Sequence, residues 1–152
     1  MRRHSQPEPE EEVEASAVEL QRTLNLLLPI RRQRLNRSER QQREQEQALQ
    51  LVNEKTSLTE QRLAERQGDY QQIRQAFMHH HGGVRQEKFR LERALQNEQQ
   101  AAEKVDNERL SLHQLAEQQL HQQAQVENAR QETRQRQREV EKLEYLLQEA
   151  FG

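Results

Sequence analysis

Five arginines at every third position are the side chains of this sequence best suited to bind a charged partner. They are Arg31, Arg34, Arg37, Arg40 and Arg43. On a helix, three-residue spacing drifts slowly around the axis, so the guanidinium groups would form a spiral ridge. A guanidinium is planar, always charged and able to bond a carboxylate through two N–H groups. The ridge therefore favours an electrostatic contact with an acidic protein surface, and the alternative is a solvated helix face.

Nucleic acid is a less suitable partner for this arginine ridge than an acidic protein surface. Glu39, Glu44 and Glu46 lie among the arginines, and the segment lacks aromatic side chains on which bases stack. Over the whole chain the net charge is -2 with both signs interspersed, so no overall field attracts nucleic acid or anionic lipid. The first residues lack the apolar run of a secretory signal or a membrane span. We expect a cytoplasmic protein that binds no nucleic acid and inserts into no membrane.

A run of three histidines, His79 to His81, raises the question of a metal site. Consecutive helical residues point in different directions, and no carboxylate motif accompanies these three. Gly82 and Gly83 follow directly and permit the backbone conformations that a chain reversal needs. We therefore interpret the histidines as a solvated hairpin tip, and we expect neither a metal nor another cofactor.

Sequence signatures of catalysis are missing as well. The chain has no G-x-x-x-x-G-K-[ST] phosphate loop, no H-E-x-x-H zinc motif and no G-x-S-x-G nucleophile turn. It also has no cysteine, which excludes disulfides and thiolate metal ligands. We expect no enzymatic activity.

Two apolar series, one on each side of the histidines, indicate the elements that would position these side chains. The first series has the three-then-four spacing of a left-handed coiled-coil seam. Its members are Leu28, Leu35, Leu49, Val52, Thr56, Thr59, Leu63, Arg66, Tyr70, Ile73 and Phe77. The second series repeats every seventh residue. Its members are Val84, Leu91, Glu98, Val105, Leu112, Gln119, Val126, Thr133, Val140 and Leu147.

The second series matches the first when its direction is inverted, which predicts an antiparallel hairpin whose arms both rise about 1.5 Å per residue. The predicted layers are Phe77 with Val84, Tyr70 with Leu91, Thr56 with Val105, Leu49 with Leu112 and Leu35 with Val126. The same register places Gln42 opposite Gln119, a polar pair that would specify alignment at some cost in stability. It leaves one mismatch, because Leu63 faces Glu98. The alternative is a homodimeric helix without a reversal, about twice as long.

Composition favours an all-α fold without a broad core. Of the 152 residues, 31% are hydrophobic and 33% charged, and only four glycines and three prolines interrupt a chain rich in good helix formers. The prediction is a long two-helix antiparallel coiled-coil hairpin with a disordered acidic tail at 1–12. Helix 1 spans 13–78 with a kink or break near Pro29, the loop spans 79–83, and helix 2 spans 84–151. Because the seam is narrow and partly polar, we expect marginal stability in isolation.

The segment around the arginine ridge also resembles a known family. It is similar to the N-terminal signature of the YscO/HrpO proteins of bacterial type III secretion, relatives of the flagellar protein FliJ. Its residues are Leu26-Leu27-Leu28-Pro29-Ile30-Arg31-Arg32-Gln33-Arg34, continuing to Arg37-Ser38-Glu39-Arg40. Ser38 stands where alanine is common in that family, and the absence of tryptophan is a further departure. The signature covers about a tenth of the chain, whereas the hairpin pattern covers nearly all of it.

The resemblance implies a central stalk that links the hexameric secretion ATPase to the export gate and escorts secretion chaperones. Such a protein lies in the cytoplasm, peripheral to the inner membrane at the base of the secretion apparatus. By this analogy the arginine ridge, with Leu143 and Leu147, contacts the ATPase, and Phe77 and Met78 contact the gate. The alternative function is a general coiled-coil adaptor or chaperone-like protein that binds a partner's helix along the same seam.

Overall fold

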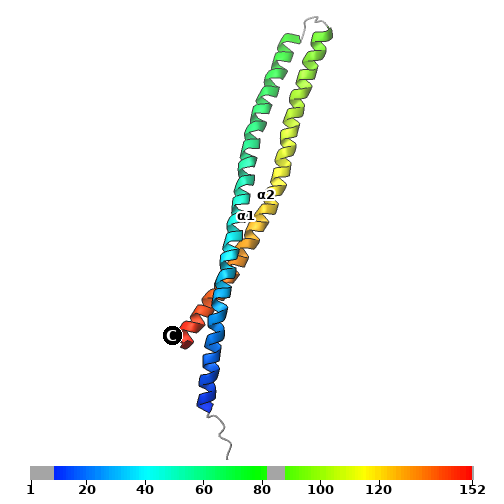
Figure 1. Cartoon of the computed structure of the whole chain (residues 1–152). Helices are drawn as coiled ribbons and strands as arrows, with labels where there is room; N and C mark the ends of the chain where they lie inside the picture. The colour runs from blue at the N-terminus through cyan, green and yellow to red at the C-terminus, as the bar shows by residue number, and fades with distance from the viewer. Residues whose placement is uncertain (1–8, 82–87, 152) are drawn as a thin grey trace, which may run out of the picture. The chain divides into compact units, whose positions relative to one another are not determined.

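The computed structural model describes residues 9–81 and 88–151, and these form two long helices. Helix α1 spans Pro9–His81 and helix α2 spans Lys88–Phe151 (Figure 1). The helices pack against each other with opposite chain directions, and the described ranges contain no strand. The predicted two-helix hairpin is therefore confirmed. Hydrogen bonds between α1 and α2 of one chain contradict the alternative of a continuous helix without a reversal.

Helix α1 is longer at both ends than predicted. It begins at Pro9 rather than residue 13, and Glu10 to Glu12 occupy its first turn, where the helix dipole favours negative charge. At the other end it includes His79 to His81, which the prediction had assigned to the loop. Residues 1–8, 82–87 and 152 lie outside the described residues, and with them lie the rest of the predicted tail, Gly82, Gly83 and the predicted start of helix 2 at Val84.

Pro29 lies inside α1 without breaking it, so the predicted break does not occur. Proline removes one backbone N–H, the one that would bond the carbonyl of Asn25. The residues on both sides of Pro29 contact α2: Leu28 is half-buried, and the Arg31 guanidinium bonds a backbone carbonyl of α2. These tertiary contacts hold the helix together across the missing backbone bond.

The chain divides into two compact units, which are described separately. The terminal unit contains residues 9–45 of α1 and 125–151 of α2. The central unit contains residues 46–81 of α1 and 88–124 of α2. In each unit an α1 segment packs along an α2 segment, so each has its own stretch of the coiled-coil seam.

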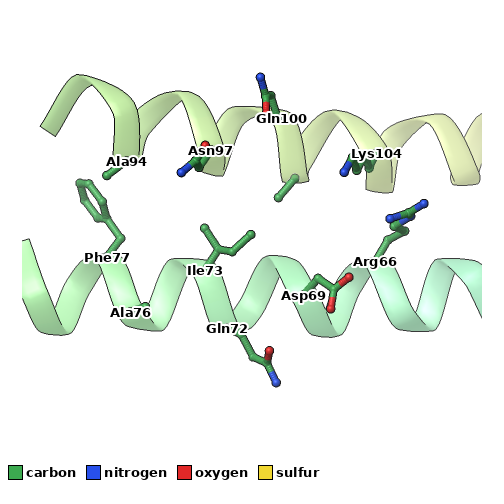
Figure 2. Close-up of a pocket in the computed structure, with 11 residues that line it drawn as sticks. Arg66, Asp69, Gln72, Ile73, Ala76, Phe77, Ala94, Asn97, Gln100 and Lys104 are labelled. Carbon is green, nitrogen blue, oxygen red and sulfur yellow. The ribbon is translucent and has the colours of Figure 1, made fainter. Parts of the chain in front are cut away.

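Buried and half-buried side chains follow the predicted coiled-coil spacing along both helices. Of the predicted seam residues, Val105 and Val126 are buried, and the half-buried ones are Leu28, Leu35, Leu49, Tyr70, Phe77 and Leu112. Leu91 is a correction, because its side chain is 39% exposed. Phe77, which was predicted to lie in the layer next to the loop, lies against Ala94 (Figure 2). Leu91 is three residues before Ala94 and therefore lies beyond the end of the seam at Phe77.

The predicted register between the helices is wrong by about three helical turns. It would place Asn53 opposite Glu108, but the Nε2 amide of Gln119, eleven residues farther along α2, donates to Asn53 Oδ1 at 2.7 Å. Gln119 therefore does not pair with Gln42 as predicted. The predicted layers of described residues shift with it, including Tyr70 with Leu91 and the mismatch of Leu63 with Glu98, whereas Val84 lies outside the described residues. The spacing of the seam is right, whereas the alignment of one helix against the other is not.

Candidate interaction surfaces

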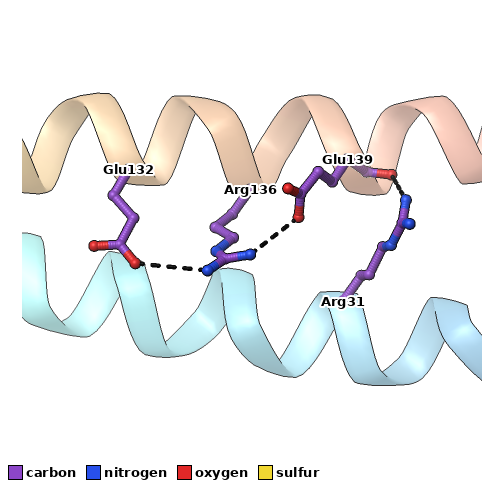
Figure 3. Close-up of polar contacts among 4 residues, drawn as sticks. All are labelled: Arg31, Glu132, Arg136 and Glu139. Carbon is purple, nitrogen blue, oxygen red and sulfur yellow. Dashed lines mark hydrogen bonds and ion pairs between the residues drawn. The ribbon is translucent and has the colours of Figure 1, made fainter.

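In the terminal unit, one of the five ridge arginines, Arg31, contacts α2, as does its neighbour Arg32, which lies outside the ridge. Arg31 lies at a half-buried seam position, and its Nη1 donates to the backbone carbonyl of Glu139 on α2 at 3.3 Å (Figure 3). Arg32 pairs with the carboxylate of Glu144, also on α2, at 3.0 Å. Both guanidiniums therefore bridge α1 and α2, Arg31 from a half-buried position and Arg32 through an exposed ion pair.

The contact of Arg31 belongs to a larger polar layer in the same seam. Arg136 of α2 is 29% exposed and pairs with Glu139 at 3.2 Å and with Glu132 at 3.8 Å (Figure 3). Glu139 thus accepts from Arg136 through its side chain and from Arg31 through its backbone. A charged side chain is tolerated at a seam position only with such partners, because an unpaired charge loses its solvation there.

The other four arginines form the surface that a partner can reach. Arg34, Arg37, Arg40 and Arg43 are all exposed, and no residue of the described ranges forms an ion pair or hydrogen bond with them. We call these four residues the free ridge. Its positive charge is fixed at any physiological pH, and its planar donors suit carboxylate groups on a partner.

The apolar residues predicted to accompany the ridge are mostly internal. Leu143 is 3% exposed and belongs to the seam of the terminal unit, and Leu147 is half-buried. Leu143 can therefore contact a partner only if α1 moves away from it. Exposed apolar groups of this unit are found instead off the seam, on α1 at Leu26 and Ile30 and on α2 at Tyr145.

The central unit contains a groove of about 500 Å³ between α1 and α2 (Figure 2). Phe77 and Ile73 supply its large apolar side chains from α1. Ala94 faces Phe77 from α2, and Ala101 of α2 also lines the groove. Asn97 lies between these alanines, so the α2 wall consists of small or polar side chains. The groove exists because the α2 side chains are too small to fill the space opposite Phe77 and Ile73.

Charged residues mark one end of this groove, and apolar residues lie exposed near the other. Arg66 and Lys104 line the first end from α1 and α2, with Asp69 nearby (Figure 2). Met78, predicted as a tip contact, directly follows Phe77 and is 66% exposed. On α2, Phe89 and Leu95 are also exposed.

Sequence reasoning missed Phe89, Leu95, Leu26 and Ile30 as accessible apolar groups. The available signal was their position, since each is a large apolar residue outside the heptad seam. The side chains of His80 and His81 lie outside what the structure describes. Within the described residues no cluster of three metal-ligating side chains occurs.

Neither helix, over the residues that the structure describes, includes a stretch long and apolar enough to cross a membrane. No protein-family model, curated protein or solved structure matches this chain. Functional interpretation therefore depends on the residues themselves.

Proposed function

We propose that this protein is the central stalk of a bacterial type III secretion apparatus, linking the hexameric secretion ATPase to the export gate. The observation that carries the proposal is the free ridge: four exposed arginines without a partner in the described ranges, on a two-helix hairpin. The resemblance of residues 26–40 to the YscO/HrpO signature supports it, because the free ridge begins within that signature. On this proposal the protein works in the cytoplasm, peripheral to the inner membrane, without catalysing a reaction.

In this mechanism the free ridge of the terminal unit binds acidic side chains of the ATPase, and bonds from Arg31 and Arg32 keep α1 and α2 together during that contact. Phe77 and Met78 of the central unit bind the export gate through apolar contact. Long helices suit a linking role, because the backbone N–H groups inside them are bonded and each residue adds about 1.5 Å of length.

The ATPase contact is tested by reversing charge at the free ridge. We expect that R34E/R37E must be added at a concentration at least about tenfold higher to stimulate the secretion ATPase. Each substitution replaces an attraction to acidic side chains of the ATPase by a repulsion. The matched control is R90E/R93E, two exposed arginines of α2 with the same spacing. Equal stimulation by both variants would remove the free ridge from the mechanism, provided that circular dichroism shows unchanged helix content.

The gate contact is tested at Met78. Because this side chain is exposed, we expect its substitution to leave the fold intact. We expect M78D to reduce association with the export gate protein and to leave ATPase stimulation unchanged. The control is L120D, because Leu120 is a similarly exposed apolar residue of the same unit. Normal gate association of M78D would move that contact elsewhere.

A second candidate function is a coiled-coil adaptor or chaperone-like protein that binds a foreign helix. The groove beside Phe77 and Ile73 favours it, because an amphipathic helix can insert apolar side chains into such a space. Secretion chaperones are among the partners that this mode would suit. Mixing the purified protein with a secretion ATPase separates the candidates, since the adaptor has no reason to stimulate ATP hydrolysis.

A further inference from the structure

Nine exposed residues form one continuous stripe on the face of α1 that points away from α2. They follow one another at three- and four-residue intervals, so they share a helix face. They are Glu12, Ser16, Glu19, Thr23, Leu26, Ile30, Gln33, Arg37 and Arg40. Leu26, for example, is midway between the seam residues Leu24 and Leu28 and is 67% exposed. We call this set the outer stripe, and all of it belongs to the terminal unit.

Charge and hydrophobicity change in order along the outer stripe. Its N-terminal third is acidic, and residues 9–21 contain five glutamates and no lysine or arginine. Its centre is apolar, with Leu26 and Ile30, the latter 47% exposed. Its C-terminal third is basic, and residues 20–38 contain no acidic residue. A surface with negative, apolar and positive parts in this order is complementary to its own inverted copy.

The match can be followed residue by residue when a second copy of α1 is laid antiparallel with Leu26 on Leu26. Both helices rise equally, so residues equally far from Leu26 on opposite sides face each other. Glu12 then faces Arg40 of the other copy, Glu19 faces Gln33, and Thr23 lies beside Ile30. A parallel copy would instead oppose Glu12 with Glu12 and Arg40 with Arg40.

We propose that the outer stripe is the interface of an antiparallel homodimer with its twofold axis at Leu26. The occupant is a second copy of this chain, because an inverted copy presents its basic end to the acidic end of the stripe and its acidic end to the basic end. Such an interface is isologous, so each Glu12–Arg40 pairing occurs twice. The overlap from residue 12 to residue 40 extends over about 40 Å of helix.

The dimer is weak and sensitive to salt. Each copy contributes two large apolar residues at the centre, Leu26 and Ile30, so charge pairs at the two ends supply much of the attraction. Exposed charges are screened within about 10 Å at 0.1 M salt. Dimerisation therefore strengthens at low ionic strength and weakens as salt is added.

Charge reversal with recombination tests the proposal. The variant E12R/E19R has positive charge at both ends of the stripe, and R37E/R40E has negative charge at both ends. By sedimentation equilibrium at low salt, each variant alone dimerises at least about tenfold more weakly than the wild type, and an equimolar mixture recovers the dimer. A wild-type monomer at every concentration, or a mixture that stays monomeric while both variants remain helical by circular dichroism, overturns the proposal.

Single cysteines test the orientation, since the chain contains no native cysteine. With a short bis-maleimide crosslinker, L26C links to itself, whereas E12C alone does not and instead links to R40C when the two are mixed. The control is L120C, because Leu120 of α2 has nearly the same exposure, 69%, and is not in the stripe. A self-link of E12C as efficient as that of L26C overturns the antiparallel arrangement.

The inference does not rest on the proposed function, although Arg37 and Arg40 belong to both surfaces. L26E places two carboxylates at the twofold axis and leaves every arginine in place. We expect it to abolish dimerisation and preserve stimulation of the secretion ATPase. Unchanged stimulation in R34E/R37E overturns only the stalk contact, and an undiminished dimer in L26E overturns only the homodimer.

Discussion

The terminal unit and the central unit use the same heptad spacing but fill it with side chains of different size. In the terminal unit the buried apolar residues are Leu24, Val126, Val140 and Leu143. In the central unit they are Ala101 and Val105, while the larger side chains Leu63, Ile73 and Phe77 stay half-buried. Spacing thus determines which residues face inward, and side-chain volume determines how well they pack. The groove beside Phe77 is the result of small residues on the facing helix.

The polar contacts between α1 and α2 also differ between the two units. In the terminal unit Arg31 bonds the backbone carbonyl of Glu139 across the seam, beside the pair of Arg136 with Glu139 within α2. Arg32 adds an exposed pair with Glu144. In the central unit the Gln119 side-chain amide donates an exposed hydrogen bond to Asn53 Oδ1 between the helices. We expect the central unit to open locally at lower free energy, since opening it exposes less apolar surface. Five substitutions test this difference.

The largest effect is expected at Leu143, in the better packed unit. L143A removes a side chain that is 3% exposed and leaves a cavity, which should lower the free energy of unfolding by about 2–5 kcal/mol. In the central unit V105A should cost about 1.5 kcal/mol, because fewer buried carbons are lost. Urea unfolding followed by circular dichroism measures both. The exposed control L120A should change stability by less than about 0.5 kcal/mol, and a similar value for L143A would contradict the comparison.

The next largest effect should come from filling the groove of the central unit. Ala94 is half-buried and faces Phe77, so A94L adds apolar atoms to space that α2 leaves empty (Figure 2). We expect a gain of about 1.5 kcal/mol in the free energy of unfolding and slower amide exchange in residues 94–104. The same substitution at exposed Gln99, Q99L, is the control, because Gln99 does not line the groove. Destabilisation by A94L would mean that the central unit is already fully packed.

Heptad spacing made the seam predictable but left the register undetermined. Seam positions follow one another at intervals of three and four residues. If one helix slides by about ten or eleven residues, its seam residues therefore again face the seam residues of the other helix. The predicted layers and the observed pairing of Asn53 with Gln119 differ by such a slide. Inverted leucine spacing therefore cannot choose between registers, and the choice depends on how many residues the reversal uses.

The sequence alone is enough to separate the arginine of the ridge that contacts α2 from the four that are exposed. Arg31 lies at a seam position between Leu28 and Leu35, so its contact with α2 follows from the same heptad that predicted the seam. Arg34, Arg37, Arg40 and Arg43 lie off the seam and are exposed, as a ridge available to a partner requires. The groove beside Phe77 could not be predicted, because it depends on which α2 residues face Phe77 and so on the register.

A smaller effect is expected at Thr133, where the terminal unit itself is imperfect. Its hydroxyl is buried, and no residue of the described ranges forms a hydrogen bond with it. T133V keeps the branched shape and removes the unsatisfied oxygen, so we expect a gain of about 1 kcal/mol in the free energy of unfolding. Urea unfolding measures the gain, with exposed Thr23, as T23V, for comparison. A loss of stability in T133V would show that the hydroxyl has a partner in solution.

The smallest effect is expected at Gly68, within α1 of the central unit. A Cβ built at this position would meet no atom within 4 Å, so a methyl group adds no contact and removes none. G68A should therefore act through backbone entropy alone and raise the free energy of unfolding by about 0.5–1 kcal/mol. If the central unit opens separately, amide exchange should slow in residues 46–81 and stay unchanged in residues 9–45. Equal slowing in both ranges would mean that the two units unfold together, and the difference in packing would then have no consequence for local opening.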